Sequence, residues 1–205
     1  MSLAYRILYA VGYTPWEAMA TSPLIVGQID ALFAREEAGR ERPRGPALDL
    51  GCGSGIWAVR LAERGWRVTG VDMVPKALRR ARGRAREAGV DVTLVEGDVT
   101  RLGRSGVGSG FSLLLDFGLF HDELTDEQRR AMGREVTASA AADATLLMTA
   151  FAPGRRGPLP RGASRGEIEA AYPGWSVTDE EYMDMTGAPG WARKATPRFY
   201  RLGRR

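Results

Sequence analysis

Two short motifs constrain this chain more than any other feature. Residues 47–55 read ALDLGCGSG, an apolar run that carries one acid and is followed by three glycines at alternate positions. A second apolar run, residues 68–71, ends on Asp72, seventeen residues after Gly55. Such a pair is typical of a strand, a glycine turn that opens a helix, and a second, parallel strand. We therefore expect an α/β fold in which the turn lets backbone N–H groups approach a ligand closely.

The acidic residues indicate what kind of ligand this turn accepts. Read from Gly53, the string GSGIWA also fits the dinucleotide pattern GxGxxA, so the glycines alone leave a nicotinamide or flavin cofactor open. Asp49, however, lies inside the first apolar run, and Asp98 follows a third run at residues 92–96. Together with Asp72 they would place three carboxylates around one crevice, which disfavours a pyrophosphate and favours a cationic, donor-rich ligand. S-adenosylmethionine, with its ammonium, sulfonium and ribose hydroxyls, is such a ligand.

The strings LDLGCGSG, VTGVD and VEGDV, in that order, resemble the class I S-adenosylmethionine-dependent methyltransferases over residues 46–153. The resemblance implies that Asp49 and the glycine turn hold the methionine end of S-adenosyl-L-methionine. It also implies that Asp72 binds the ribose hydroxyls and Asp98 the adenine amine. The alternative is that these acids only cap helices or end strands. The cofactor-binding residues expected on this basis are Asp49, Gly51, Gly53, Gly55, Asp72, Met73, Asp98, Val99 and Asp116.

The rest of the chain alternates between apolar runs and amphipathic stretches, which indicates a parallel sheet. With the resemblance, this predicts a Rossmann-like, seven-stranded, mostly parallel sheet with helices on both faces and an antiparallel edge hairpin. Expected strands are 47–50, 68–72, 92–96, 111–116, 145–150, 175–183 and 198–202. Expected helices are 23–39, 56–64, 75–88, 126–140 and 167–172. An amphipathic first helix is expected before Gly12, with apolar residues Leu3, Ile7, Leu8 and Val11.

The string GYTPWEAMATSPLI, residues 12–25, resembles the TPWD…TPLI stretch of the thiol, halide and thiopurine methyltransferases. This second resemblance implies that Trp16 lies against the methionine end of the cofactor, where an aromatic face suits a sulfonium cation. Glu17 stands where that pattern usually has aspartate. The alternative is that Trp16 is a buried anchor that docks its helix on the sheet.

Residues 116–122, DFGLFHD, follow the fourth expected strand, beside the place where methyl transfer must occur. His121 is the only histidine, and an imidazole with a pKa of about 6.5 is suited to accept a proton from a hydroxyl or thiol. We expect His121 to be the catalytic base, although it could instead cap a helix or make a structural hydrogen bond. The apolar walls of the acceptor pocket are expected to be Phe117, Phe120 and Phe151.

Charge and composition limit the classes of ligand that we expect this protein to bind. Lysines and arginines outnumber acids by 29 to 25, and the densest basic stretch, residues 76–86, has its arginines at helical spacing on an expected outer face. Because no aromatic residues interleave with them, nucleic acid is disfavoured. Arg155 and Arg156 could clamp an anionic acceptor or form a solvated basic loop. No His, Cys and carboxylate cluster has metal-ligand spacing, so no required metal is expected.

We expect one domain over residues 1–205, with a helical lid (1–42), a cofactor-binding core (46–153) and a closing loop, helix and edge strands (154–205). A single cysteine and the lack of a long apolar run or signal peptide predict a cytoplasmic protein without a membrane anchor. Only short segments cover the strand ends, so the acceptor should be a small molecule, methylated on oxygen or sulfur. The alternatives are a cofactor-binding protein without catalysis and a methyltransferase that acts on RNA or protein. Oligomeric state is left open.

Overall fold

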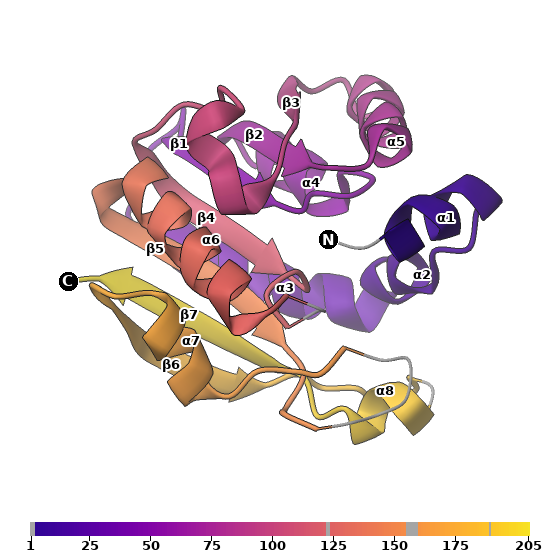
Figure 1. Cartoon of the computed structure of the whole chain (residues 1–205). Coiled ribbons are helices and arrows are strands. Elements are labelled where there is room, and N and C mark those ends of the chain that lie inside the picture. Colours follow the sequence, from indigo (N-terminus) through magenta and orange to yellow (C-terminus); the bar gives the residue numbers. More distant parts are fainter. Residues whose placement is uncertain (1–2, 122–123, 155–159, 189) are drawn as a thin grey trace.

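The computed structural model describes residues 3–121, 124–154, 160–188 and 190–205, and its centre is one seven-stranded sheet (Figure 1). The strand order is β3-β2-β1-β4-β5-β7-β6. The five parallel strands are β1 (Pro46–Leu50), β2 (Arg67–Asp72), β3 (Val92–Glu96), β4 (Phe111–Phe117) and β5 (Ala140–Ala150). The antiparallel edge pair is β6 (Trp175–Tyr182) and β7 (Arg198–Arg204), and β7 pairs with β5. The predicted fold class is confirmed.

Helices cover both faces of the sheet. They are α1 (Leu3–Val11), α2 (Pro15–Ala20), α3 (Pro23–Glu37), α4 (Ile56–Glu63), α5 (Pro75–Glu87), the short 3-10 helix η1 (Val99–Arg104), α6 (Asp126–Ser139), α7 (Arg165–Ala171) and α8 (Gly190–Lys194). Along β4 the side chains alternate between the faces, as a strand requires. Leu113 and Leu115 pack in the cluster that contains α3 and α4, and Leu114 packs in the cluster that contains α6 and α7.

Capping residues determine where several helices begin. Ser22 accepts a hydrogen bond from the Ile25 N–H, and Pro23 follows at the first helical position. Reciprocal capping boxes start α6 at Thr125 and α7 at Ser164. The starts predicted at residues 23 and 126 are therefore confirmed, and α7 begins two residues earlier than the predicted 167.

The helix α3 fastens the N-terminal region to the far edge of the sheet. The buried Glu36 pairs with Arg201 of β7, and Arg35 pairs with Glu181 of β6. Gln28 exchanges two hydrogen bonds with the backbone of Asp184, at 3.0 and 2.7 Å. These contacts also position the segment that follows β6 next to α3.

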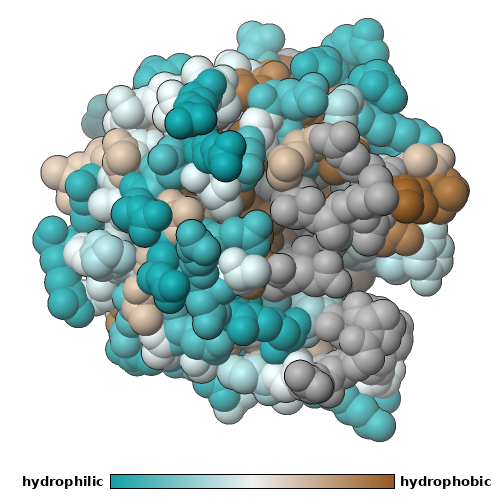
Figure 2. Space-filling view, in the orientation of Figure 1, coloured by the Kyte–Doolittle hydropathy of each residue, from teal (hydrophilic) through white to brown (hydrophobic). Residues whose placement is uncertain are grey.

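The first helix lies apart from the sheet, beyond the tip of the β4 arrow in Figure 1, and docks on α5. Lys76 Nζ donates to the carbonyl of Ala10 at 2.9 Å. Ile7 and Val11 are 52% and 70% exposed, and Figure 2 shows apolar side chains on the side where α1 lies. The apolar face predicted for this helix thus points partly to solvent, because docking on α5 turns Tyr9 inward. Among the described residues, no helix is long and apolar enough to cross a membrane.

Candidate functional site

Asp49 lies at the centre of the candidate site, near the end of β1 and flanked by Gly70 of β2 and Leu115 of β4. Its side chain is 3% exposed, and no described group makes a hydrogen bond to its buried Oδ2. Burial raises the pKa of Asp49 to about 8, and the carboxylates of Asp72 and Asp116 add to the rise. A buried acceptor oxygen without a donor is rare in proteins, so this atom fits a ligand that brings a donor or a positive charge.

The glycine turn between β1 and α4 has the open backbone that the motif predicts. Gly53 and Gly55 have φ of 53° and 76°, in the left-handed region that favours glycine. A Cβ on Gly55 would lie 2.8 Å from the Cβ of Ala81, and one on Gly53 would lie 2.8 Å from Oη of Tyr9. The turn therefore has no room for a side chain at Gly55, and one at Gly53 would require Tyr9 to move. The turn leads into the N-terminus of α4, where helix N–H groups favour negative ligand atoms.

Asp72, at the end of β2, fastens this turn to the next helix. Its Oδ2 accepts the N–H of Gly53 at 2.9 Å, and its Oδ1 accepts the N–H of Val74 at 2.8 Å. Burial raises the pKa of Asp72, and the N–H groups of Val74, Gly53 and Met73 oppose that rise. Each oxygen of a carboxylate can accept a second hydrogen bond, so these contacts leave capacity for ligand hydroxyls.

Asp98 follows β3 and caps η1. Its Oδ1 accepts from the backbone N–H of Thr100 at 2.9 Å and from the Thr100 hydroxyl at 2.7 Å. Val99 beside it is buried. The structure thus gives Asp98 the capping contacts of the alternative interpretation, while the residue still lies at the carboxyl end of a parallel strand beside Asp72.

Asp116 and Phe120 have structural surroundings that the sequence did not suggest. The Asp116 carboxylate is fully buried and accepts the N–H groups of Leu119 and Phe120, which holds the turn after β4. Burial raises the pKa of Asp116 to about 6 against these hydrogen bonds. The Phe120 ring is also fully buried, 4.7 Å from the guanidinium carbon of Arg129 and packed on Tyr172. In this structure the Phe120 ring therefore packs in the core cluster that contains residues of α6 and α7.

His121, at the end of that turn, makes two contacts through Nδ1. Nδ1 lies 3.3 Å from the carbonyl oxygen of Thr149 and 3.3 Å from the backbone nitrogen of Phe151. The imidazole stacks on the Phe151 ring at 4.5 Å. The backbone carbonyl of His121 accepts the N–H of Gly162 at 3.1 Å. Phe151 thus supports the imidazole of His121. Asp122, the residue after His121, lies outside the described residues.

Phe117 lies in a half-buried apolar region. Its ring contacts Trp57 at 5.7 Å and Phe33 at 6.2 Å. Met19 of α2 and Met183, after β6, are half-buried side chains packed against the same cluster. The sequence predicts Met183 only as the last residue of a strand at 175–183, because no motif marks it as part of a site.

The N-terminal helices place Tyr9 beside the glycine turn and Trp16 against Tyr9. Tyr9 is 3% exposed and packs on Val74 and Ala77, next to the end of β2. Trp16 is half-buried and meets the Tyr9 ring edge to face, with 5.7 Å between centroids. The sequence singles out Trp16 but not Tyr9, because the apolar spacing of α1 favours its aliphatic residues.

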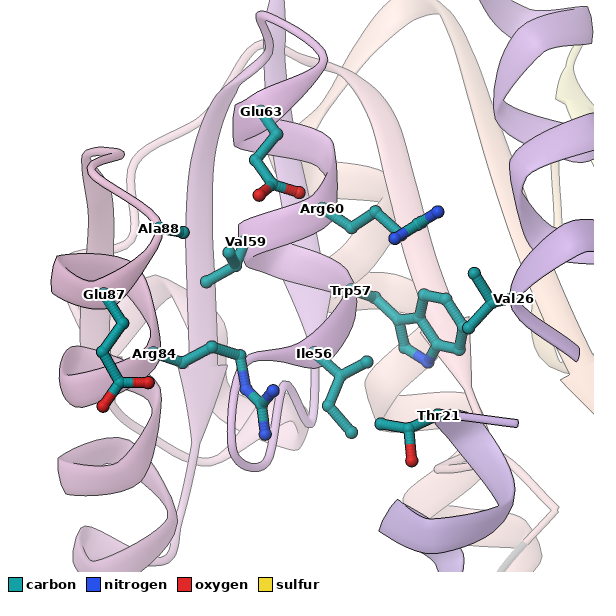
Figure 3. A pocket seen from close by; sticks show the side chains of 10 residues that line it. All are labelled: Thr21, Val26, Ile56, Trp57, Val59, Arg60, Glu63, Arg84, Glu87 and Ala88. Carbon is teal, nitrogen blue, oxygen red and sulfur yellow. The ribbon is translucent and has the colours of Figure 1, made fainter. Parts of the chain in front are cut away.

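A hollow of about 400 Å³ lies elsewhere, between α3, α4 and α5 (Figure 3). Its lining includes Arg60, Glu63, Arg84 and Glu87, and Figure 3 shows Arg84 extending from α5 toward Ile56 and Arg60 extending from α4 toward Val26. None of the predicted site residues lines it. We therefore place the candidate site at the strand ends and not in this charged groove.

The remaining predictions concern anions and metals. Arg155 and Arg156 lie outside the described residues. Arg161, nearby, forms an ion pair with Asp126. Within the described ranges, no group of three or more His, Cys, Asp or Glu side chains could hold a metal ion.

Comparisons with known sequences place this geometry in context. Residues 47–142 match the family model described as a methyltransferase domain. The 2-heptyl-1-hydroxyquinolin-4(1H)-one methyltransferase of Mycobacteroides abscessus is 31% identical over 176 residues, which cover 82% of this chain and 74% of that protein. A ubiquinone biosynthesis O-methyltransferase of Paracidovorax citrulli is 43% identical over 68 residues, 33% of this chain and 26% of its own length.

Solved structures agree on the fold. Magnesium protoporphyrin IX methyltransferase from Synechocystis, with bound S-adenosylmethionine, superposes with a TM-score of 0.74 at 19% identity, covering 97% of this chain and 93% of its own. An N-methyltransferase from Bradyrhizobium japonicum in complex with S-adenosylhomocysteine gives 0.73 at 15% identity, covering 91% and 90%. At such identities the likeness shows the fold alone.

Proposed function

The chain belongs to the S-adenosylmethionine-dependent methyltransferases, and we propose that it methylates an oxygen or sulfur atom of a small molecule. The observation that carries the proposal is His121, which is held through Nδ1 in the turn that follows β4. An oxygen or sulfur acceptor must lose a proton, and a positioned imidazole can take it.

The residues at the strand ends fit the cofactor. When bound, S-adenosylmethionine supplies a methyl group on a positively charged sulfur. Asp49, whose buried Oδ2 finds no donor in the described part of the chain, would hold the methionine end together with Gly51, Gly53 and Gly55. The ribose would bind at Asp72 and Met73, and the adenine at Asp98 and Val99. Trp16 would lie against the methionine end, and Asp116 would act by shaping the turn that carries His121.

The state of His121 follows from which neighbour its Nδ1 contacts. If Nδ1–H donates to the carbonyl of Thr149, Nε2 carries the lone pair and can accept a proton from the substrate. If Nδ1 accepts from the N–H of Phe151, the proton is on Nε2 and the ring cannot act as a base. We propose that the first state is the reactive one; since the N–H of Phe151 points at Nδ1 in this structure, that state forms when this contact gives way to the one with Thr149.

We propose that the acceptor has a flat apolar body. The half-buried Phe117, Met19 and Met183 support this, since they offer apolar and polarisable surface around the end of β4. The name of the Mycobacteroides abscessus relative, which describes a hydroxylated quinolinone with a heptyl chain, supports it as well. The likeness of residues 12–25 to the thiol, halide and thiopurine methyltransferases keeps sulfur among the acceptor atoms.

The proposal extends to the domain organisation and the cellular location of the protein. Residues 1–205 would act as one domain, with residues 1–42 as a lid on the 46–153 core and residues 154–205 as the closing segment. A cytoplasmic location fits a chain whose only cysteine, Cys52, is buried and free. The acceptor would be a small molecule and not a nucleic acid.

A substrate panel tests this function. We expect wild-type protein incubated with S-adenosylmethionine to release S-adenosylhomocysteine when phenols, N-hydroxy heteroaromatics or thiols are supplied. His121→Gln should lower kcat by about 10²–10⁴-fold with S-adenosylhomocysteine affinity unchanged. Full activity of His121→Gln across neutral pH would remove it as the base. Cofactor binding without turnover of any panel member would favour the non-catalytic alternative.

A further inference from the structure

The orientation of α1 is unusual for an amphipathic helix. Ile7 and Val11 are 52% and 70% exposed, whereas the phenol of Tyr9, between them in sequence, is 3% exposed. Hydrophobic burial alone would favour the aliphatic side chains inside. The helix instead packs the aromatic ring of Tyr9 against α5, so the contacts of the Tyr9 hydroxyl determine what this orientation is for.

The Tyr9 hydroxyl lies on the glycine turn. Oη is 2.8 Å from the position that a Cβ on Gly53 would occupy, and the N–H of Gly53 is bonded to Asp72. The hydroxyl therefore lies where the turn and the β2 acid meet. Burial raises the pKa of Tyr9, and a hydrogen bond with the Trp16 side chain opposes that rise. The carboxylates of Glu17 and Asp72 raise the pKa further, Glu17 also as a hydrogen-bond partner, so the phenol keeps its proton at neutral pH.

A second polar atom of the lid is turned inward beside it. Oε1 of Glu17 is buried, and within the described residues no hydrogen-bond partner contacts it. The other oxygen of Glu17 lies 3.7 Å from Nη1 of Arg80, whose guanidinium lies 5.6 Å from the centroid of the Tyr9 ring. Arg80 on α5 thus holds both lid residues in place. The lid offers one donor, on Tyr9, and one acceptor, on Glu17.

We propose that Tyr9 and Glu17 bind the amino-acid end of the cofactor, with the Tyr9 O–H donating to its carboxylate and Glu17 accepting from its ammonium. This inference rests on the proposed cofactor site. A donor and an acceptor side by side match a zwitterion, and Asp49 offers a further buried acceptor at the same turn. The lid then recognises the part of the cofactor that adenosine lacks.

Two probes separate this role from a structural one. S-adenosylhomocysteine carries the amino-acid end, and 5′-methylthioadenosine does not. By titration calorimetry, we expect Tyr9→Phe to weaken S-adenosylhomocysteine binding by about 10–100-fold, the effect of removing a hydrogen bond to a charged group. Its affinity for 5′-methylthioadenosine should not change. Glu17→Gln should show the same selectivity. Tyr13→Phe is the matched control, since Tyr13 lies just after α1 and is 63% exposed.

The binding results distinguish failure of the proposed cofactor site from failure of the roles assigned to Tyr9 and Glu17. If the wild type bound neither probe, the proposed function itself would fail. If the wild type bound both and Tyr9→Phe matched Tyr13→Phe, the lid assignment would be wrong while the cofactor site stood. Tighter binding by Tyr9→Phe would also overturn it, because the ring would then obstruct the site. As a second readout, amide hydrogen exchange of residues 7–20 should slow with S-adenosylhomocysteine and not with 5′-methylthioadenosine.

Discussion

At the scale of single residues, the site keeps carboxyl groups in surroundings that disfavour their charge. Asp49 and Asp116 are buried, and their pKa values rise to about 8 and about 6. The free protein therefore holds acids that a cation would stabilise in their ionised form. Two buried oxygens, on Asp49 and Glu17, lack donors in the described residues. A positively charged, donor-rich ligand would therefore stabilise these buried carboxyl groups in their ionised form.

This arrangement predicts a pH dependence of stability. Unfolded Asp49 loses its proton near the ordinary pKa of 3.8, and folded Asp49 only near 8. Between these values the folded state binds more protons, so its free energy of unfolding falls as pH rises, by up to about 1.4 kcal/mol per pH unit. Denaturant unfolding of ligand-free protein between pH 6.5 and 8 should show this slope.

Asp49→Asn should remove most of that slope. Asp116, which titrates lower, serves as the internal reference, because its contribution below pH 6 should persist in both proteins. The variant should also bind S-adenosylhomocysteine at least about tenfold more weakly at pH 8, since the ionised acceptor is gone. An unchanged slope with unchanged affinity would show that Asp49 is not the buried acid of the site.

At the scale of elements, close backbone crossings determine how the helices can pack. Gly133 of α6 crosses α7 so tightly that a Cβ on it would lie 1.8 Å from the carbonyl oxygen of Ala171. That contact positions α7 and, through it, the core under the turn that carries His121. Gly83 of α5, in contrast, faces open space, with no atom within 4 Å of the point where a Cβ would lie.

These two glycines predict opposite effects of the same substitution. Gly133→Ala should lower the free energy of unfolding by about 1–3 kcal/mol or more, because α6 and α7 must move apart. Gly83→Ala should raise it by about 0.5–1 kcal/mol, because alanine is the better helix former and meets no clash. Thermal or urea unfolding of the two variants checks the sign, and equal effects would contradict the crossing.

The segment after β6 gives an element-scale prediction about the acceptor. Gln28 of α3 holds this segment through its two hydrogen bonds with Asp184, next to Met183 and the buried Met185. Gln28→Ala removes both bonds, so we expect KM for the acceptor to rise by about tenfold. The affinity for S-adenosylhomocysteine should stay as in wild type, because the cofactor residues are untouched. A change in cofactor affinity alone would contradict the acceptor role of this segment.

Sequence reasoning predicted the elements that carry strong local signals and missed those set by tertiary contacts. β1, β2 and β3 end at the predicted residues because acids and glycines mark them. β5, predicted from residue 145, begins at Ala140, since Ala140 pairs with Phe111 although alanine favours helix. The inward turn of Tyr9 depends on docking against α5, and the role of Met183 depends on α3. Neither leaves a local pattern in the sequence.

At the scale of the whole molecule, the sheet and the segments that cover its strand ends have different proposed roles in binding. We propose that the strand ends and the glycine turn, around Asp49 and Asp72, bind the cofactor. The covers, α1–α2 and the segment after β6, come from opposite ends of the chain and are joined through α3. We propose that the core and α1–α2 together bind the methyl donor, and that the segment after β6 contributes to the choice of acceptor.

The central claim is that the acidic strand ends accept a cationic adenosine cofactor and not a pyrophosphate. Titration calorimetry of the wild-type protein with S-adenosylhomocysteine and with NAD, in the same buffer, tests it most directly. We predict saturable, one-site binding of S-adenosylhomocysteine and no measurable binding of NAD. Binding of NAD without S-adenosylhomocysteine would contradict the assignment of Asp49, Asp72 and Asp98.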